Sequence, residues 1–325
     1  MTRLRQIMLG GLAALVVGGA VSSAFAEESG TFQNRLNGAT IGIPAGAAAP
    51  PGLYSGLETA YLGFPGSGKG NQAPGLFLPA IANAVPIVWS TGWNFLGANF
   101  SMVAVQAWYM GMVLPSYPNL YGSGPFPATL GGFMVNANTF WSPINLSWNL
   151  GGGWFVSVAF NFTGPDGARY AGTPNPDYWT FEPAAAISYL GNNWVASANF
   201  YYDINTQSSG VCCAGLPITS GNALYGDFFA AYKIGKWELG PVAYFEAQTT
   251  ADSGPGCTTA PAACAFYSNV AVGGLVGYDF GPVDIQVWVT DSVARQNAID
   301  GLDFWTRIGF RIWAPEAPKP LVAKN

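Results

Sequence analysis

The sequence predicts an all-β fold: a transmembrane, antiparallel, up-and-down β-barrel of about twelve strands. Three observations predict it. Hydrophobic residues make up 50% of the chain and charged residues only 9%, against roughly 25% charged in an ordinary soluble domain. Beyond the N-terminus, no apolar run reaches the ~18 residues that a membrane-spanning helix needs. Apolar and polar residues instead alternate with a period of two, which is typical of strands with one face in lipid and the other in an enclosed interior.

Residues 1–26 are typical of a secretory signal peptide. Arg3 and Arg5 precede an apolar run over residues 7–21, and Ala24-Phe25-Ala26 has the A-x-A form of a cleavage site. The alternative, an uncleaved membrane anchor, is disfavoured because the run is short and rich in glycine. Cleavage leaves 12 − 2 = 10 basic residues against 17 acidic ones, a net charge of −7. A chain this acidic is not expected to bind nucleic acid, which requires clustered Lys and Arg.

Residues 27–50, rich in Ala, Gly and Pro, show no period and are expected to form a flexible N-terminal segment. The alternative is that this segment folds back and occludes the pore.

Residues 51–313 are expected to form the barrel. The run from Trp194 to Asn205 alternates most clearly, because every second residue from Trp194 is apolar and most of the residues between are polar. The expected strands are 52–64, 80–91, 94–113, 131–150, 153–163, 177–190, 193–206, 220–234, 236–250, 266–280, 283–295 and 302–313. Twelve is an even number, as in single-chain bacterial outer-membrane barrels.

The connections between these strands alternate between short and long. The expected short turns are 91–93, 151–152, 191–192, 235 and 281–282, and the long connections are 65–79, 114–130, 164–176, 207–219, 251–265 and, somewhat shorter, 296–301. Outer-membrane barrels have short periplasmic turns and long outer loops, so both termini, including a tail over residues 314–325, are expected in the periplasm. Tryptophans near the short turns predict an aromatic girdle at that interface: Trp89, Trp93, Trp154, Trp194 and Trp237.

Charged residues within the strands fall opposite the apolar stripes and are expected to line the pore. The candidates are Glu58, Glu182, Asp203, Asp227, Lys233, Glu246, Asp284, Asp303, Arg307 and Arg311. A charge facing lipid near the midplane costs about 2 to 4 kcal/mol, so an interior position is favoured whatever the role of these residues. They either line a solute path or form a structural network that fills the barrel.

The chain contains no histidine, which removes the most common general base and a principal metal ligand. We therefore expect neither an enzyme nor a cofactor. The four cysteines lie in two expected outer loops, Cys212-Cys213 and Cys257 with Cys264. An exported protein meets an oxidising compartment, and four cysteines allow three pairings, of which a bridge between Cys257 and Cys264 is favoured. The alternative is that the loop cysteines stay free.

Several strings resemble one known family. They are Pro50-Pro51-Gly52-Leu53-Tyr54, Tyr178-Trp179-Thr180-Phe181-Glu182-Pro183, Tyr202-Asp203-Ile204-Asn205-Thr206, Asp252-Ser253-Gly254-Pro255 and Gly277-Tyr278-Asp279-Phe280-Gly281-Pro282. In this order, from about Pro50 to Phe310, they resemble the phenol meta-pathway (MetA-pathway of phenol degradation) family of outer-membrane β-barrel proteins. The resemblance implies a transporter of aromatic or other hydrophobic compounds, often linked to degradation pathways. The cysteine-bearing loops and the proline-rich tail depart from the family pattern.

Together these features predict an outer-membrane channel for small hydrophobic or aromatic compounds, with membrane lipid and such solutes as its partners. A twelve-stranded barrel lies between small filled barrels and wide porins, so its passage is expected to be narrow or gated. The main alternative is a non-transporting surface barrel whose long outer loops bind a partner. The sequence does not define the oligomeric state.

Overall fold

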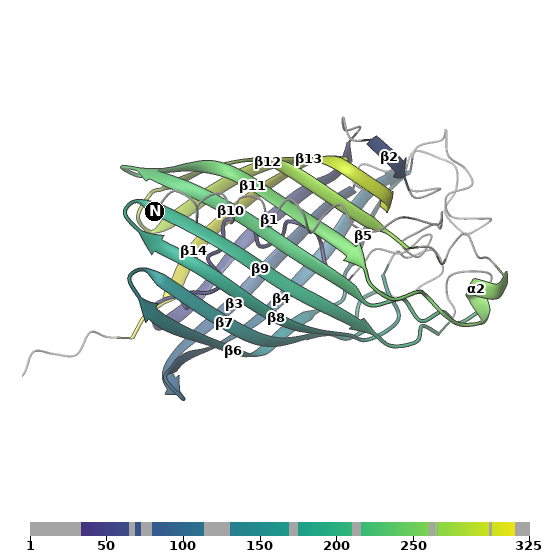
Figure 1. Ribbon diagram of the computed structural model, residues 1–325, viewed down its shortest axis with the longest axis horizontal. Helices are drawn as coiled ribbons and strands as arrows, with labels where there is room; N and C mark the ends of the chain where they lie inside the picture. The colour runs from purple at the N-terminus through teal and green to yellow at the C-terminus, as the bar shows by residue number, and fades with distance from the viewer. Residues whose placement is uncertain are drawn as a thin grey trace, which may run out of the picture.

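The computed structural model describes residues 34–64, 69–72, 80–113, 131–168, 175–209, 216–259, 264, 266–298 and 301–315. Twelve antiparallel strands form a closed barrel in which each pairs with the next along the ring and the last, β14, pairs with the first, β1. The ring order is β1-β3-β4-β6-β7-β8-β9-β10-β11-β12-β13-β14, and the pairing of β12 with β13 completes it. The predicted twelve-stranded barrel is therefore confirmed (Figure 1).

Apart from β6, which begins nine residues after the predicted start at residue 131, the barrel strands agree with the predicted ones to within about four residues. They are β1 (Gly52–Phe64), β3 (Ala80–Phe95), β4 (Ala98–Val113), β6 (Phe140–Gly151), β7 (Trp154–Thr163), β8 (Thr180–Gly191), β9 (Trp194–Asn205), β10 (Ala223–Ile234), β11 (Trp237–Gln248), β12 (Ser268–Asp279), β13 (Val283–Ala298) and β14 (Leu302–Trp313). Two short strands add to the ring: β2 (Lys69–Gln72) runs parallel to the outer end of β13, and β5 (Gly131–Asn136) pairs with β4. The short helix α2 spans Pro255–Thr259.

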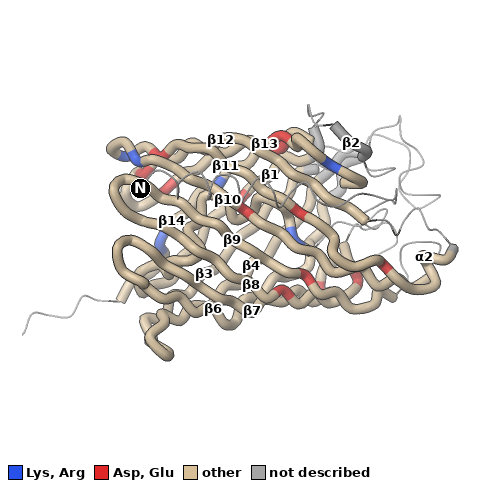
Figure 2. The backbone as a smooth tube through the Cα atoms, in the orientation of Figure 1, with Lys and Arg blue, Asp and Glu red and all other residues tan. Residues whose placement is uncertain are grey.

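The two faces of the strands differ as the alternation predicts. Along β9, Phe200 and Ile204 are exposed on the outside, whereas Asn199 and Asp203 are buried. Charges are sparse along the whole barrel (Figure 2). No helix in the described part of the chain has the length and hydropathy needed to cross a bilayer.

Short turns join the strands at one end of the barrel, and the strand ends that flank the long connections lie at the other (Figure 1). The first short turn was expected at residues 91–93, but β3 continues to Phe95 and the turn is formed by Leu96 and Gly97, both with positive φ. The strand continues because Gly92, with a φ of 75°, accommodates a register shift between β3 and β4 that lies between Ser90 and Asn94. The five predicted girdle tryptophans are all exposed near this end, between 39% and 60%.

The strand expected over residues 131–150 is interrupted at Ala137–Thr139, which separates β5 from β6. Here the Asn138 side chain donates to Asn34 Oδ1 and Pro176 O and accepts from Gly167 N–H. The Thr139 N–H donates to Asp166 rather than to a neighbouring strand. Ala137 N–H still donates to Ala107 O on β4, so loop contacts replace the ladder at Asn138 and Thr139 only, which alternation alone does not reveal.

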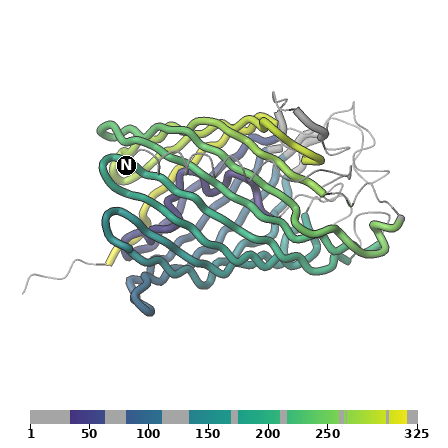
Figure 3. The backbone as a smooth tube through the Cα atoms, in the orientation of Figure 1, coloured from purple at the N-terminus to yellow at the C-terminus, as the bar shows by residue number. Residues whose placement is uncertain are grey.

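Residues 34–50, expected to be part of a flexible lead-in, run inside the ring of strands (purple in Figures 1 and 3). We call them the luminal segment. They bond to inward-facing side chains of nine barrel strands, from Ser90 on β3 to Arg307 on β14. The alternative of a segment that folds back into the barrel is therefore the one observed for these residues. Residues 1–33 and 316–325, which include the expected signal peptide and most of the tail, lie outside the described residues.

Candidate functional site: the barrel interior

The structure brings most of the predicted pore-lining residues together inside the barrel. Seven of the ten are buried, with no more than 9% of each residue exposed: Glu58, Glu182, Asp203, Asp227, Glu246, Asp303 and Arg307. The other three, Lys233, Asp284 and Arg311, are exposed toward the short-turn end. Lys233 forms an ion pair with Glu238 there, at 3.8 Å. The interior charges are therefore mostly carboxylates.

Arg35 of the luminal segment supplies the positive charge that the wall lacks on one side. Its Nη1 atom donates to both carboxylate oxygens of Glu182 at 3.2 Å, and its Nη2 atom donates to Asp227 Oδ2 at 3.3 Å. The guanidinium carbon lies 3.3 Å from the centre of the Tyr201 ring. Charge-assisted hydrogen bonds and cation–π contact both strengthen when water is excluded, so Arg35 is a strong anchor for the segment.

Asp227, on β10, is the acceptor with the most bonds to the luminal segment. Besides Arg35, it accepts from Gly38 N–H at 3.0 Å, Thr40 N–H at 3.1 Å and the Thr40 hydroxyl at 2.6 Å. Only 1% of the residue is exposed. A buried carboxylate requires this many donors because an unpaired buried charge is very costly.

Arg307, on β14, is a wall residue that donates hydrogen bonds to the backbone of the luminal segment. Its Nη2 and Nη1 atoms donate to Ala39 O and Ile41 O, each at 2.6 Å, and its Nε atom donates to Glu58 at 3.1 Å. The Ile41 side chain is fully buried in the interior apolar cluster that contains Tyr244, Trp288 and Trp305. One arginine from the segment and one from the wall thus fix the same stretch of backbone.

Two glycines let the segment approach the wall closely. Gly42 has a φ of +80°, and a Cβ there would lie 2.6 Å from the side-chain oxygen of Gln286. A Cβ on Gly46 would lie 2.8 Å from the backbone nitrogen of Ser188 on β8. The second contact is with backbone, which cannot move aside as a side chain can. Glycine at residue 46 is therefore required for the segment to seat against β8.

Sequence reasoning missed Arg35 because it lies in a segment without periodicity. One signal could have identified it: the predicted pore-lining set contains seven carboxylates and three basic residues. Arg35 is the only basic residue between the signal peptide and Lys69. Since buried charges are almost always paired, this imbalance favours a cation from outside the strands.

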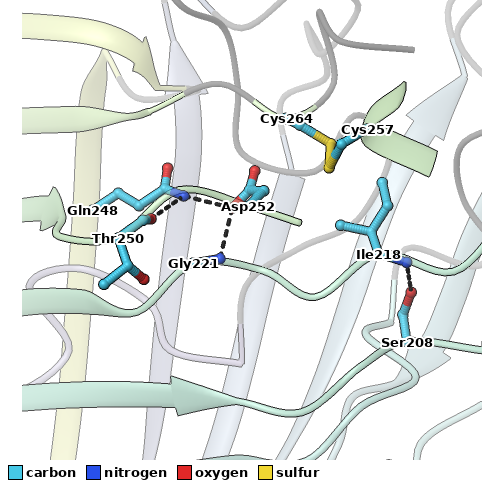
Figure 4. Close-up of a disulfide and its surroundings, with 8 residues drawn as sticks. All are labelled: Ser208, Ile218, Gly221, Gln248, Thr250, Asp252, Cys257 and Cys264. Carbon is cyan, nitrogen blue, oxygen red and sulfur yellow. Dashed lines mark hydrogen bonds between the residues drawn. A yellow bond between two sulfur atoms is a disulfide. The ribbon is translucent and has the colours of Figure 1, made fainter. Parts of the chain in front are cut away.

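The outer loops contain a second organised region, around the disulfide that joins Cys257 of α2 to Cys264 (Figure 4). Nearby, Asp252 accepts hydrogen bonds from Gly221 N–H and the Gln248 side chain. Burial raises the pKa of Asp252 to about 6, although these two bonds lower it. Cys212 and Cys213 lie outside the described residues. Within the described ranges, no group of three or more His, Cys, Asp or Glu is placed to hold a metal ion.

A closed ring of twelve antiparallel strands with an apolar outer surface and a polar interior defines an outer-membrane β-barrel protein. Over residues 63–308 the chain matches the family described as "Putative MetA-pathway of phenol degradation", and it belongs to this family. The resemblance found in the sequence is thereby confirmed. No sequence among the curated proteins matches the chain.

One solved structure shows the same fold, and others are more distantly similar. An outer membrane channel from Pseudomonas putida F1 is similar at a TM-score of 0.59 and 12% identity, over 81% of this chain and 96% of that one. The CymD monoaromatic hydrocarbon channel gives a TM-score of 0.41 at 10% identity, over 89% and 94% of the two chains. A Pseudomonas aeruginosa FadL homologue gives 0.40 at 10% identity, over 90% and 99%. The last two scores are too low to support an argument, and the first supports the fold alone.

Proposed function

We propose that the mature protein is an outer-membrane channel for small hydrophobic or aromatic compounds, and that the luminal segment closes it at rest. One observation carries the proposal: the enclosed interior is occupied by residues 34–50, which bond to the wall through side chains and form no ladder with any strand. Barrels of eight strands are filled by their own side chains, whereas those of sixteen hold open water. Release of the segment would leave a passage of intermediate width.

The class of solute is supported by the aromatic residues of the inner wall. Trp288 and Trp305 stack at 5.4 Å with ring planes 10° apart, and both are buried in the interior. Tyr201, Tyr225 and Tyr244 are also buried there. Flat aromatic rings gain stacking energy from such a wall. The family description, which refers to phenol degradation, agrees with this class and with a link to a degradation pathway.

Uptake of labelled aromatic compounds tests the proposal. Cells that carry the gene should accumulate phenol-sized neutral aromatics faster than an isogenic deletion strain, and a plasmid copy should restore the rate. Purified protein in liposomes should pass the same compounds faster than empty vesicles do. Equal rates in both assays across a broad panel would overturn the proposal.

Export belongs to the same proposal. We expect the signal peptide to be removed after Ala26, so that the mature chain begins at Glu27. Intact mass measurement of protein from the outer-membrane fraction should give the mass of residues 27–325. The mass of the full chain would contradict cleavage.

A further inference from the structure

The surroundings of Arg35 form a complete cage for a planar cation. Glu182 binds the guanidinium through both of its oxygens, and Asp227 binds a second nitrogen. Tyr201 covers the guanidinium face at 3.3 Å, and the ring centre of Tyr225 lies 5.9 Å away. The side chains of Arg35, Glu182 and Asp227 are only 8%, 5% and 1% exposed. Two carboxylates and an aromatic face are the groups that recognise amidinium and guanidinium ions.

The cage is built by the barrel wall and not by the luminal segment. Its residues lie on three adjacent strands, β8, β9 and β10, and Tyr201 is paired directly with Tyr225 in the β9–β10 ladder. A closed ladder fixes the backbone positions of these residues whatever occupies the interior. The residues of the cage therefore remain neighbours when Arg35 leaves.

The cage also holds more negative charge than Arg35 neutralises. Asp203, on β9, is 3% exposed, and its Oδ1 atom accepts no hydrogen bond in the described part of the chain. Asp203 interacts electrostatically with Arg35 and shares a side-chain hydrogen bond with Glu182, which requires a proton on one of these two carboxyl groups. With Asp227, the cage still carries one negative charge more than Arg35 neutralises, and Asp203 Oδ1 is an unused acceptor. A buried acceptor without a donor indicates a place for a further donor group.

We propose that the cage formed by Glu182, Asp203, Asp227, Tyr201 and Tyr225 is a binding site for planar organic cations, and that Arg35 is its resident occupant. The site takes amidinium, guanidinium and protonated arylamine groups, which displace Arg35 and so loosen the luminal segment. The neutral isostere of such a solute leaves the carboxylates unpaired, and the matching anion is repelled by them. The part of the inference that treats these cations as transported solutes rests on the proposed channel function.

Three probes of one shape separate charge from aromatic contact: benzamidinium, neutral benzamide and benzoate. They are titrated by calorimetry into the full mature protein in detergent, as wild type, as Arg35→Ala, and as the control Arg311→Ala, which removes an exposed arginine. Arg35→Ala should bind benzamidinium at least tenfold more tightly than wild type or the control does, and at least tenfold more tightly than benzamide. Adding Asp227→Asn to Arg35→Ala should reverse that gain. Equal affinity for benzamidinium and benzamide, or no binding to folded Arg35→Ala, would overturn the inference.

A second measurement requires no variant and so holds even if Arg35→Ala does not fold. In the wild type, the amides of Gly38 and Thr40 donate to Asp227 and are protected while the segment is seated. Saturating benzamidinium should accelerate their hydrogen exchange at least tenfold, and benzamide should not. Identical exchange with both probes would refute displacement of Arg35.

The two proposals fail in different ways. Flux of neutral aromatics through liposomes without charge-selective binding would leave the channel in place and remove the cation site. Charge-selective binding without any flux would leave the cation site in place and remove the channel.

Discussion

Asp227→Asn should release the luminal segment. The substitution keeps the size of the side chain but places an amide nitrogen where Oδ2 now accepts from Arg35, from Thr40 N–H and from the Thr40 hydroxyl. If the amide flips, the nitrogen instead faces the Gly38 N–H, which now donates to Oδ1. In either orientation at least one donor of the segment faces another donor.

The magnitude follows from the burial of this cluster. Removing one partner of a buried, hydrogen-bonded ion pair costs about 3 to 5 kcal/mol. Arg35 keeps its two bonds to Glu182 in the variant, so we take the lower end, about 3 kcal/mol. Since about 1.4 kcal/mol corresponds to a factor of ten, the ratio of released to seated segment should rise about 100-fold.

Hydrogen exchange measures this ratio directly, because exchange in the native state reports the equilibrium of local opening. The informative amide is that of Gly46, which donates to Ser188 and not to Asp227. Its exchange should accelerate about 100-fold if the segment leaves as a unit, and single-channel conductance in planar bilayers should rise in parallel. The control is Asp284→Asn, which neutralises an exposed carboxylate near the short-turn end. Unchanged protection of the Gly46 amide, or an equal effect of the control, would refute the reasoning.

Three further perturbations test other parts of the structure. Phe200→Arg, on the outer face in the middle of β9, should lower the free energy of unfolding in lipid vesicles by about 2 to 4 kcal/mol. Ile234→Arg, at the end of β10, should lower it by less than about 1 kcal/mol. Equal losses would argue against the proposed membrane position. Replacing Cys257 and Cys264 together with serine should destabilise the outer loop by about 2 kcal/mol without lowering the melting temperature of the barrel, and limited proteolysis of this loop should become faster. Because burial raises the pKa of Asp252 to about 6 from 3.8, the ordered loop binds more protons than the disordered loop between these values, so its stability falls as the pH rises from 4 to 6. NMR titration of Asp252 should give a midpoint near 6. In Asp252→Asn, the order of the loop should no longer depend on pH between 4 and 6. A midpoint near 4 in the wild type would contradict the burial of this carboxyl group.

The strands were predictable because their signal is local. A lipid-facing strand must place apolar residues at every second position, and the sequence shows this period wherever the wall is regular. The alternation from Trp194 to Asn205 consequently located β9 and both of its faces. The same alternation predicts Asp203, Asp227 and Arg307 on the inner face of the wall, and the structure buries all three.

What the sequence did not reveal depends on contacts between distant residues. Asn34 and Arg35 bond to Thr180 and Glu182, almost 150 residues away, and nothing in the local pattern near residue 35 indicates these partners. The interruption at Asn138 has the same origin, since its side chain bonds to Asn34 and Pro176. Periodicity describes how a strand meets lipid and water, but it carries no information about which chain segment fills the interior.

The chemistry that holds the luminal segment suits a segment that must also leave. Ile41 is fully buried, but most of the bonds to the wall are polar, such as those from Ser147 and Arg307 to backbone carbonyls. A neutral hydrogen bond contributes only about 0.5 to 1.5 kcal/mol net, because water replaces it when the partners separate. A segment packed through apolar side chains would instead lose roughly 25 cal/mol for each Å² exposed to water. Polar attachment to a wall that becomes wet on opening therefore keeps the free-energy difference between the seated and released states small. The buried ion pairs of Arg35 and the hydrogen bonds from Arg307 to the segment then decide which state prevails.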